Sequence, residues 1–182
     1  MLGVYFLWVT PRYNAYTFET SNSSFSASYC LQQGESYCVP KAVLLGALCR
    51  LYNIPARLGL ADVRNHLASP QFIEHLKSDV FVMHGYTDIF LQGKWVKATP
   101  AFDAGLCRLM NVKPLEFNGR EDSIFHEFDN AGDRHMEYLA EHGHFADVPQ
   151  QRILDAVALA YPHLVSEFNT PSERSLYQDI EN

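Results

Sequence analysis

Cys38 has the sequence surroundings of a nucleophilic cysteine. It follows a turn-like stretch, Gly34-Glu35-Ser36, and it precedes an apolar run that is expected to form a helix. At the start of a helix, unpaired backbone N–H groups and the positive end of the helix dipole favour a thiolate over a thiol. Pro40 fits a first helical turn, where its missing N–H has no intrahelical acceptor. Because a single cysteine is more often a buried structural residue, this chemistry requires a partner base elsewhere in the chain.

The run that follows Cys38 is predicted to be a buried central helix. It is apolar nearly all round, with Ala42, Val43, Leu45, Gly46, Ala47 and Leu48. The helix is expected to end at Tyr52-Asn53-Ile54-Pro55, and a strand is expected over 56–63. Residues 64–77 are predicted to be a loop with a short helix.

A β-hairpin over residues 79–99 is the clearest strand pattern. Two β-rich runs flank Gln92-Gly93, which is typical of a two-residue turn. The turn predicts these pairs: Leu91 with Lys94, Phe90 with Trp95, Asp88 with Lys97, and Tyr86 with Thr99. Because side chains alternate along a strand, His84 shares a face with Thr99. If the hairpin packs against the start of the helix, His84 can serve as the base that a nucleophilic Cys38 needs.

Composition points to one folded domain over residues 1–182. The chain has 182 residues, 47% hydrophobic and 19% charged, which is enough for one sizeable core. The net charge of -7 and the absence of a Lys/Arg cluster argue against a nucleic-acid partner. The apolar start is too short to span a membrane and lacks a signal-peptide pattern. We expect its apolar side chains to belong to the core and to form a helix that ends near Pro11, with earlier elements left as an open question.

Four cysteines without a metal-type CxxC pair favour a reduced, cytoplasmic setting over disulfides. We expect three of them to be core residues: Cys30, Cys49 and Cys107.

Residues 17–33 are rich in Ser, Thr and Asn and are predicted to be a loop. In the second half, helices are predicted over 135–141 and 151–160, followed by a polar tail over 171–182.

The motifs taken in chain order resemble the transglutaminase-like superfamily, including its bacterial-type cysteine proteases. They are GESYC at 34–38, IPAR at 54–57, His84, and GKWVKATP at 93–100. The resemblance covers roughly residues 1–103, with a helical extension over about 104–170. It implies an α+β, papain-like transglutaminase core, in which a central nucleophile helix packs on an antiparallel β-sheet. By this resemblance Cys38 is the nucleophile and His84 the base.

The third member of the triad is where the sequence departs from the family pattern. The family commonly has an aspartate in a W-x-x-x-D-P-T-like motif, and here Thr99 stands at that position. Asp103 is the favoured substitute, since the chain could swing back after Pro100, with Thr99 as the alternative. Asp88 lies about 13 Å along the strand, too far for a direct bond to His84.

The oxyanion hole is expected to use the Cys38 backbone N–H and one upstream side chain. The nearest candidates are Gln32, Gln33 and Tyr37, and the sequence does not choose among them. The stretch 62–66, DVRNH, is given no role beyond possible substrate contact.

Neither a metal nor a cofactor is expected. A cluster of histidines and carboxylates in the second half resembles a metal site in composition only, because no HExxH or other zinc spacing appears. Its members are interpreted as a solvated surface: His135, His142, His144, Glu137, Glu141 and Asp147.

The leading functional hypothesis is a thiol hydrolase that acts on a peptide, protein or amide substrate through an acyl-enzyme. The alternatives are a non-catalytic binding or scaffold domain, acyl transfer to an amine, and a different amide chemistry such as glycan removal from asparagine. Crosslinking would need a second open channel for the amine. Substrate identity and oligomeric state are not fixed by the sequence.

Overall fold

A four-stranded antiparallel sheet forms the centre of the protein. The computed structural model describes residues 24–34 and 36–167; the N-terminal helix predicted to end near Pro11 and the polar tail over 171–182 lie outside these residues. The sheet has the order β3-β2-β1-β4, from β1 (Ala56–Asn65), β2 (Val80–Leu91), β3 (Lys94–Ala98) and β4 (Met136–Phe145). Mixed helices and an antiparallel sheet confirm the α+β class.

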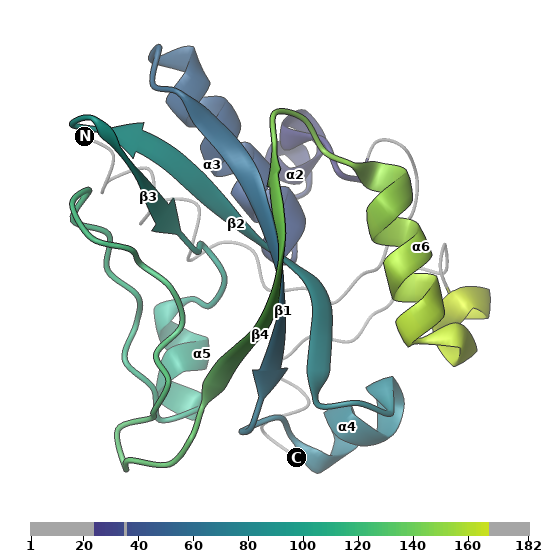
Figure 1. The fold of residues 1–182 in the computed structure, drawn as a ribbon. Helices are drawn as coiled ribbons and strands as arrows, with labels where there is room; N and C mark the ends of the chain where they lie inside the picture. Colours follow the sequence, from purple (N-terminus) through teal and green to yellow (C-terminus); the bar gives the residue numbers. More distant parts are fainter. Residues whose placement is uncertain (1–23, 35, 168–182) are drawn as a thin grey trace.

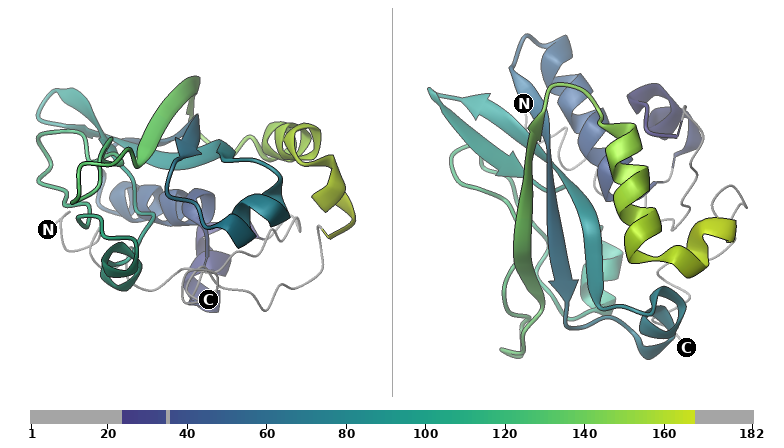
Figure 2. Two further views of the ribbon diagram at one scale, coloured as in Figure 1. Left: turned by 90° about the horizontal axis from the view of Figure 1, so that it is seen from below. Right: turned by 45° about the vertical axis from the view of Figure 1, so that its right-hand side comes forward.

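The helices lie mostly on one side of this sheet. In the left-hand view of Figure 2, α2 (Ala27–Gln33), α3 (Cys38–Leu51) and α5 (Ala104–Leu109) all lie on the same side of the strands. In Figure 1, α6 (Gln150–Ala160) lies along the right-hand side of the sheet and α4 (Pro70–Leu76) lies at its lower end; the 3₁₀ turn η2 (Pro162–Glu167) follows α6. No helix among the described residues is long and apolar enough to cross a membrane.

The predicted hairpin register is confirmed. β2 and β3 pair Leu91 with Lys94, Phe90 with Trp95 and Asp88 with Lys97. Gln92 and Gly93 both have positive φ, 51° and 85°, as a two-residue turn that matches strand twist requires. The strand β3 ends at Ala98, so the fourth predicted pair, Tyr86 with Thr99, lies beyond the ladder.

The predicted central helix is α3, and it begins at Cys38. Pro40 therefore falls in its first turn, as expected. One cluster of buried side chains joins α3 to β1, β2 and α6 through Val39, Ala42, Leu58, Leu60, Met83, Ile153 and Val157. A second cluster joins the other end of α3 to the hairpin through Leu45, Cys49, Ile89 and Val96. Burial on both sides explains why the helix shows no polar face.

Two backbone-level contacts hold α3 on β2. The Thr87 hydroxyl donates a 2.8 Å hydrogen bond to the Ala42 carbonyl. A Cβ added at Gly85 would lie 2.8 Å from the Cα of Val39, closer than real Cβ contacts come. The first turn of α3 thus rests directly on the β2 backbone, which only glycine permits at that position.

The part of β2 that precedes His84 is held on one side by a tyrosine. The hydroxyl of Tyr161 accepts a 3.0 Å hydrogen bond from the N–H of Val82 and donates a 2.6 Å bond to the carbonyl of Val80. Burial raises the pKa of Tyr161 to about 12, which keeps the hydroxyl protonated as a donor. β3 does not pair with this part of β2. The Tyr161 side chain therefore makes hydrogen bonds that a neighbouring strand would otherwise make.

Two segments differ from the sequence-based predictions. Residues 27–33, predicted as loop, form the helix α2, because Ser26 caps its N-terminus through Tyr29 N–H and Gly34 closes it in the left-handed conformation. Residues 135–141, predicted as helix, belong instead to the strand β4, which pairs with β1. The segment after residue 103 therefore contributes a strand to the sheet as well as helices, and only the helix predicted over 151–160 is confirmed, as α6.

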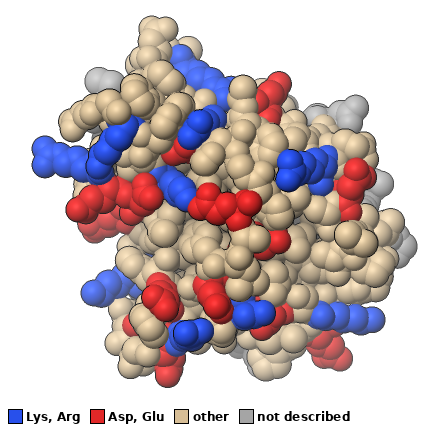
Figure 3. Space-filling view, viewed as in Figure 1, with Lys and Arg blue, Asp and Glu red and all other residues tan. Residues whose placement is uncertain are grey.

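The sheet face turned away from α3 carries a polar network. Asp88, 2% exposed, binds Arg57 at 2.7 Å and His144 at 3.3 Å. The Tyr86 hydroxyl lies 3.4 Å from Glu141 and 3.3 Å from His144. Figure 3 shows acidic and basic side chains interspersed over the face seen in Figure 1, so that neither sign forms a continuous patch there.

Replacement of Tyr161 by Phe is expected to lower the free energy of unfolding by about 1–2 kcal/mol, because it removes two part-buried hydrogen bonds, one from the Val82 N–H and one to the Val80 carbonyl. Chemical denaturation monitored by circular dichroism measures this value. Tyr52→Phe, at a half-exposed position, is the control and should change stability by about 0.5 kcal/mol or less. Equal stability of Tyr161→Phe and the parent protein would show that the hydroxyl does not support β2.

Candidate active site

The thiol of Cys38 lies against the backbone of β2. The N–H groups of Gly85, of Val39 and of Cys38 itself lie near the sulfur and act to lower the pKa of the thiol. These N–H groups, together with the Lys41 ammonium, favour the thiolate. Burial has the larger effect and raises the pKa of the thiol above its ordinary value. The residue as a whole is only partly buried, so solvent reaches it although its surroundings are dense.

Lys41 is a buried cation one turn after Cys38, on the same side of α3. It is 1% exposed, and its ammonium donates a hydrogen bond to the Ala101 carbonyl. Burial lowers its pKa to about 8, while the charges of Cys38 and Asp103 act in the opposite direction. Sequence reasoning missed this residue. The signal was a lysine within an apolar helix, since lysine is almost never fully buried without a partner.

His84 is buried as a neutral imidazole. It is 6% exposed, its ring packs 4.9 Å from that of Phe125, and its Nε2 has no hydrogen-bond partner among the described residues. Burial, assisted by the positive charge of Lys41, lowers its pKa to about 3. The ring is therefore uncharged at neutral pH.

Cys38 and His84 are related through Gly85 of β2 and through Lys41. The thiol contacts the N–H of Gly85, the residue that directly follows His84. The positive charge of Lys41 acts on both the Cys38 thiol and the His84 imidazole. Both groups therefore lie near one ammonium, beside a part of β2 that does not pair with β3.

The two candidates for the third position have different surroundings. Asp103 caps α5: its Oδ1 accepts from the N–H groups of Gly105 at 2.6 Å and Leu106 at 2.9 Å. Its charge also acts on Lys41. Thr99 is fully buried beside Tyr138, and its hydroxyl makes no well-formed hydrogen bond with a described residue. Neither side chain binds Nε2 of His84 in this structure.

The candidate oxyanion donors are placed unequally. Gln32 and Gln33 are exposed at the end of α2, whereas Tyr37 is partly buried and packs edge-on against Phe25, with ring centroids 6.4 Å apart. Tyr37 is also the residue before α3, and its side chain makes no hydrogen bond that caps the helix. The Tyr37 side chain does not compete for the N–H groups of the first turn, which can therefore interact with the thiol and with a bound substrate.

An aromatic cluster surrounds His84 and contains a second buried histidine. Phe125 packs against Phe102 at 4.9 Å and His135 at 6.1 Å. His135 is 2% exposed, and neither ring nitrogen has a hydrogen-bond partner among the described residues. Burial lowers its pKa to about 4. The predicted solvated surface is wrong for this residue, because the loop before β4 turns it into the cluster.

The remaining histidines of the predicted surface group bind carboxylates of the sheet. His142 lies 2.7 Å from Asp62 and His144 lies 3.3 Å from Asp88, and both histidines are partly buried. In the described part of the chain, no group of three or more His, Cys, Asp or Glu residues is arranged to hold a metal ion.

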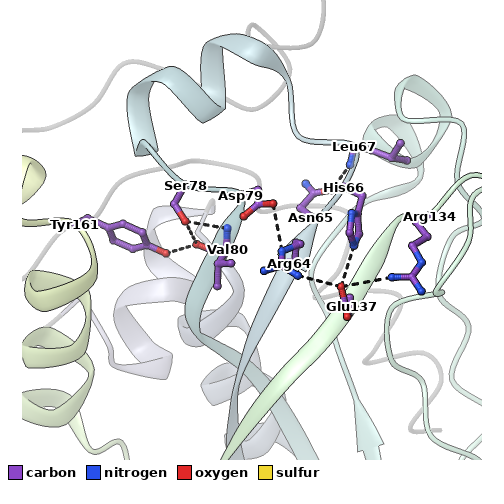
Figure 4. Close-up of polar contacts among 10 residues, drawn as sticks. All are labelled: Arg64, Asn65, His66, Leu67, Ser78, Asp79, Val80, Arg134, Glu137 and Tyr161. Atoms are coloured by element: carbon purple, nitrogen blue, oxygen red, sulfur yellow. Dashed lines mark hydrogen bonds and ion pairs between the residues drawn. The ribbon is translucent and has the colours of Figure 1, made fainter.

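The polar stretch over residues 62–66 makes internal contacts. Arg64 binds Asp79 at 3.2 Å and Glu137 at 3.3 Å, and His66 binds the same Glu137 oxygen at 3.1 Å. Figure 4 shows Glu137 on β4 as the acceptor shared by Arg64, His66 and Arg134. These ion pairs tie β4 to the end of β1, where sequence reasoning allowed only a substrate contact.

Because His84 and His135 are buried neutral, stability is expected to fall as pH falls below 6.5. An unfolded histidine takes up a proton near pH 6.5, whereas the folded residues do so only near pH 3 and pH 4. For each of the two histidines, the free energy of unfolding falls by about 1.4 kcal/mol per pH unit between pH 6.5 and the pKa of the folded residue. His135→Gln should flatten the decline between pH 6.5 and 5, measured by denaturant unfolding, whereas His163→Gln should leave it unchanged. An unaltered slope in His135→Gln would contradict the burial of a neutral ring.

Comparison with known proteins identifies the family. Residues 5–100, just over half of the 182-residue chain, match the family model of the transglutaminase-like superfamily core. Comparisons with curated proteins and with solved structures gave no match. The matched range contains both Cys38 and His84, together with α3 and the hairpin. The chain belongs to the transglutaminase-like superfamily.

Proposed function

We propose that the protein is a thiol hydrolase of peptide or amide bonds, with Cys38 as nucleophile and His84 as base. The observation that carries the proposal is the contact of the Cys38 thiol with Gly85 N–H, next to a buried, neutral His84. Membership of the superfamily supports a cysteine-based hydrolase or acyltransferase. The four cysteines are unpaired, which suits a reducing compartment such as the cytoplasm.

The reaction starts from an uncharged thiol and an uncharged imidazole. His84 takes the thiol proton as the sulfur attacks the substrate carbonyl carbon, and the carbonyl oxygen becomes an oxyanion beside the first-turn N–H groups of α3. His84 then gives the proton to the leaving amine as the C–N bond breaks, which leaves a thioester on Cys38. Water attacks the thioester with His84 again as base, and the acid product leaves.

Lys41 supplies a fixed positive charge to this sequence of steps. Its ammonium favours the thiolate form of Cys38 and disfavours a protonated His84. The charge therefore helps the sulfur to lose its proton and helps the imidazole to pass the proton on. Asp103, whose charge acts on Lys41, is proposed as the third member, with Thr99 as the alternative.

A non-catalytic binding domain is the second candidate function. Two observations favour it: Nε2 of His84 has no hydrogen-bond partner in the part of the chain that the structure describes, and Thr99 occupies the position where the family pattern has an acid. Without a group that fixes the imidazole, proton transfer slows, and the fold retains a surface without a competent triad. Release of the acyl group to an amine in place of water is a variant of the first candidate, and it uses the same residues.

The protein is expected to form an acetyl thioester on Cys38 when treated with p-nitrophenyl acetate, detected by mass spectrometry of the native protein. His84→Ala should slow acetylation by about 100-fold or more, which is the usual contribution of a general base. His163→Ala, a histidine bound to the His75 carbonyl far along the chain, is the matched control. Absence of a Cys38 adduct would favour the binding domain.

The pH dependence of this acetylation follows from the protonation state of His84. With its pKa near 3, the imidazole is already neutral at pH 5, so the acetylation rate should be nearly flat between pH 5 and 7. Stopped-flow absorbance of the released nitrophenolate, corrected for its own ionisation, measures the rate. A rise with an apparent pKa near 6.5 would show that His84 is solvated, in contradiction to its burial.

Asp103→Asn separates the charge of Asp103 from its role as helix cap. Asparagine caps a helix as well as aspartate, so stability should stay within about 0.5 kcal/mol while acetylation slows, because the charge that acts on Lys41 is lost. Asp103→Ala should in addition lose about 1 kcal/mol of stability. Thr99→Val tests the alternative. Parent-like acetylation in Asp103→Asn, with a loss in Thr99→Val, would move the third role to Thr99.

A further inference from the structure

A break in the regular pairing of the sheet lies directly before His84. Ala61 of β1 faces His84 of β2, whereas Val63 faces Phe81. Asp62 alone is therefore opposite two residues, Val82 and Met83, which is the pattern of a β-bulge on β2. Bulges of this kind turn the side chain that follows them, and they are frequent beside active sites.

The bulge contains a strained backbone. Met83 has φ of 56°, in the left-handed region that residues other than glycine rarely adopt. Such a conformation persists only where surrounding contacts hold it. Met83 is also 5% exposed and packs in the main core cluster. Core packing therefore holds its side chain, while its backbone changes the direction of the strand directly before His84.

One carboxylate oxygen holds the backbone of this bulge. Oδ1 of Asp62 accepts a 2.9 Å hydrogen bond from the N–H of Met83 and lies 2.7 Å from Nε2 of His142. His142 itself occupies a second irregularity, since Leu60 faces Gly143 and Ala61 faces Glu141 in the pairing of β1 with β4. The irregular residues of three adjacent strands are thus joined through a single side chain.

We propose that Asp62 is a positioning residue for His84, which holds the bulge at Met83 and thereby sets the direction from which the imidazole approaches the Cys38 thiol. The inference rests on the proposed function and assigns a role to a polar residue that does not touch the reacting atoms. Proton transfer depends steeply on geometry, because a displacement of about 1 Å can cost about 100-fold in rate. Tyr161 binds Val80 and Val82 independently, so loss of Asp62 frees Met83 without releasing the whole strand.

If Asp62 acts by holding Met83 at positive φ, glycine at position 83 should compensate for the loss of the Asp62 carboxylate, because glycine adopts positive φ without such a contact. Asp62→Ala should slow acetylation of Cys38 by p-nitrophenyl acetate by about 10-fold or more and shift the ring resonances of His84 in a long-range ¹H–¹⁵N spectrum. Asp62→Asn keeps an oxygen for the Met83 N–H and should stay near the parent. Asp62→Ala/Met83→Gly should recover both rate and resonance. Glu137→Ala, another carboxylate of the sheet that binds His66, is the matched control.

The resonance separates this proposal from the proposed function. If the parent protein forms no acetyl adduct, the hydrolase proposal fails, while a His84 resonance that moves in Asp62→Ala and returns in the double variant still supports positioning. A folded Asp62→Ala protein with parent-like rate and resonance overturns the role of Asp62. If Asp62→Ala does not fold, the double variant decides: a folded protein with parent-like resonance supports the proposal, and a displaced resonance or failure to fold overturns it.

Discussion

The position of the thiol depends on the missing side chain of Gly85. A methyl group there would press on the backbone of Val39, which cannot rotate away as a side chain can. Only with that space empty does the first turn of α3 rest on β2, and only then does the Cys38 sulfur reach a strand N–H. The core clusters on either side of α3 pack around this one close approach. The reactive end of the helix is therefore fixed by backbone against backbone, the stiffest contact available in a folded chain.

Burial, rather than the helix dipole, dominates the electrostatics of the candidate site. The first-turn N–H groups and Lys41 favour a thiolate, yet desolvation outweighs them and also keeps His84 uncharged. The resting pair is therefore neutral, and charge develops only as the sulfur attacks. A buried ammonium then serves best as a pre-placed counter-charge, since it needs no reorganisation at the moment of reaction.

Local patterns predicted the elements whose structure is local, and they failed where distant segments decide. The hairpin register followed from a two-residue turn and side-chain alternation, and α3 followed from its apolar run and Pro40. Helix-forming residues such as Met136 and Glu137 suggested a helix, but pairing with β1 makes the segment a strand, since tertiary context overrides propensity. Cys38 and His84 were proposed from motif order. The burial of Lys41 could not be predicted, because it depends on where the chain after Pro100 returns. The cap by Asp103 is local, since it binds the N–H groups of Gly105 and Leu106, but sequence reasoning did not predict the helix α5.

The late position of β4 in the chain also has a consequence during synthesis. Until Met136–Phe145 has emerged from the ribosome, β1 presents an unpaired edge of N–H and C=O groups beside an already formed hairpin. About 70 residues separate the end of β1 from the start of β4, which corresponds to roughly 4 to 14 s at ordinary translation rates of about 5–20 residues per second. Throughout that interval the nascent chain carries a strand edge able to pair with another chain, and closure of the sheet coincides with delivery of His142 to Asp62.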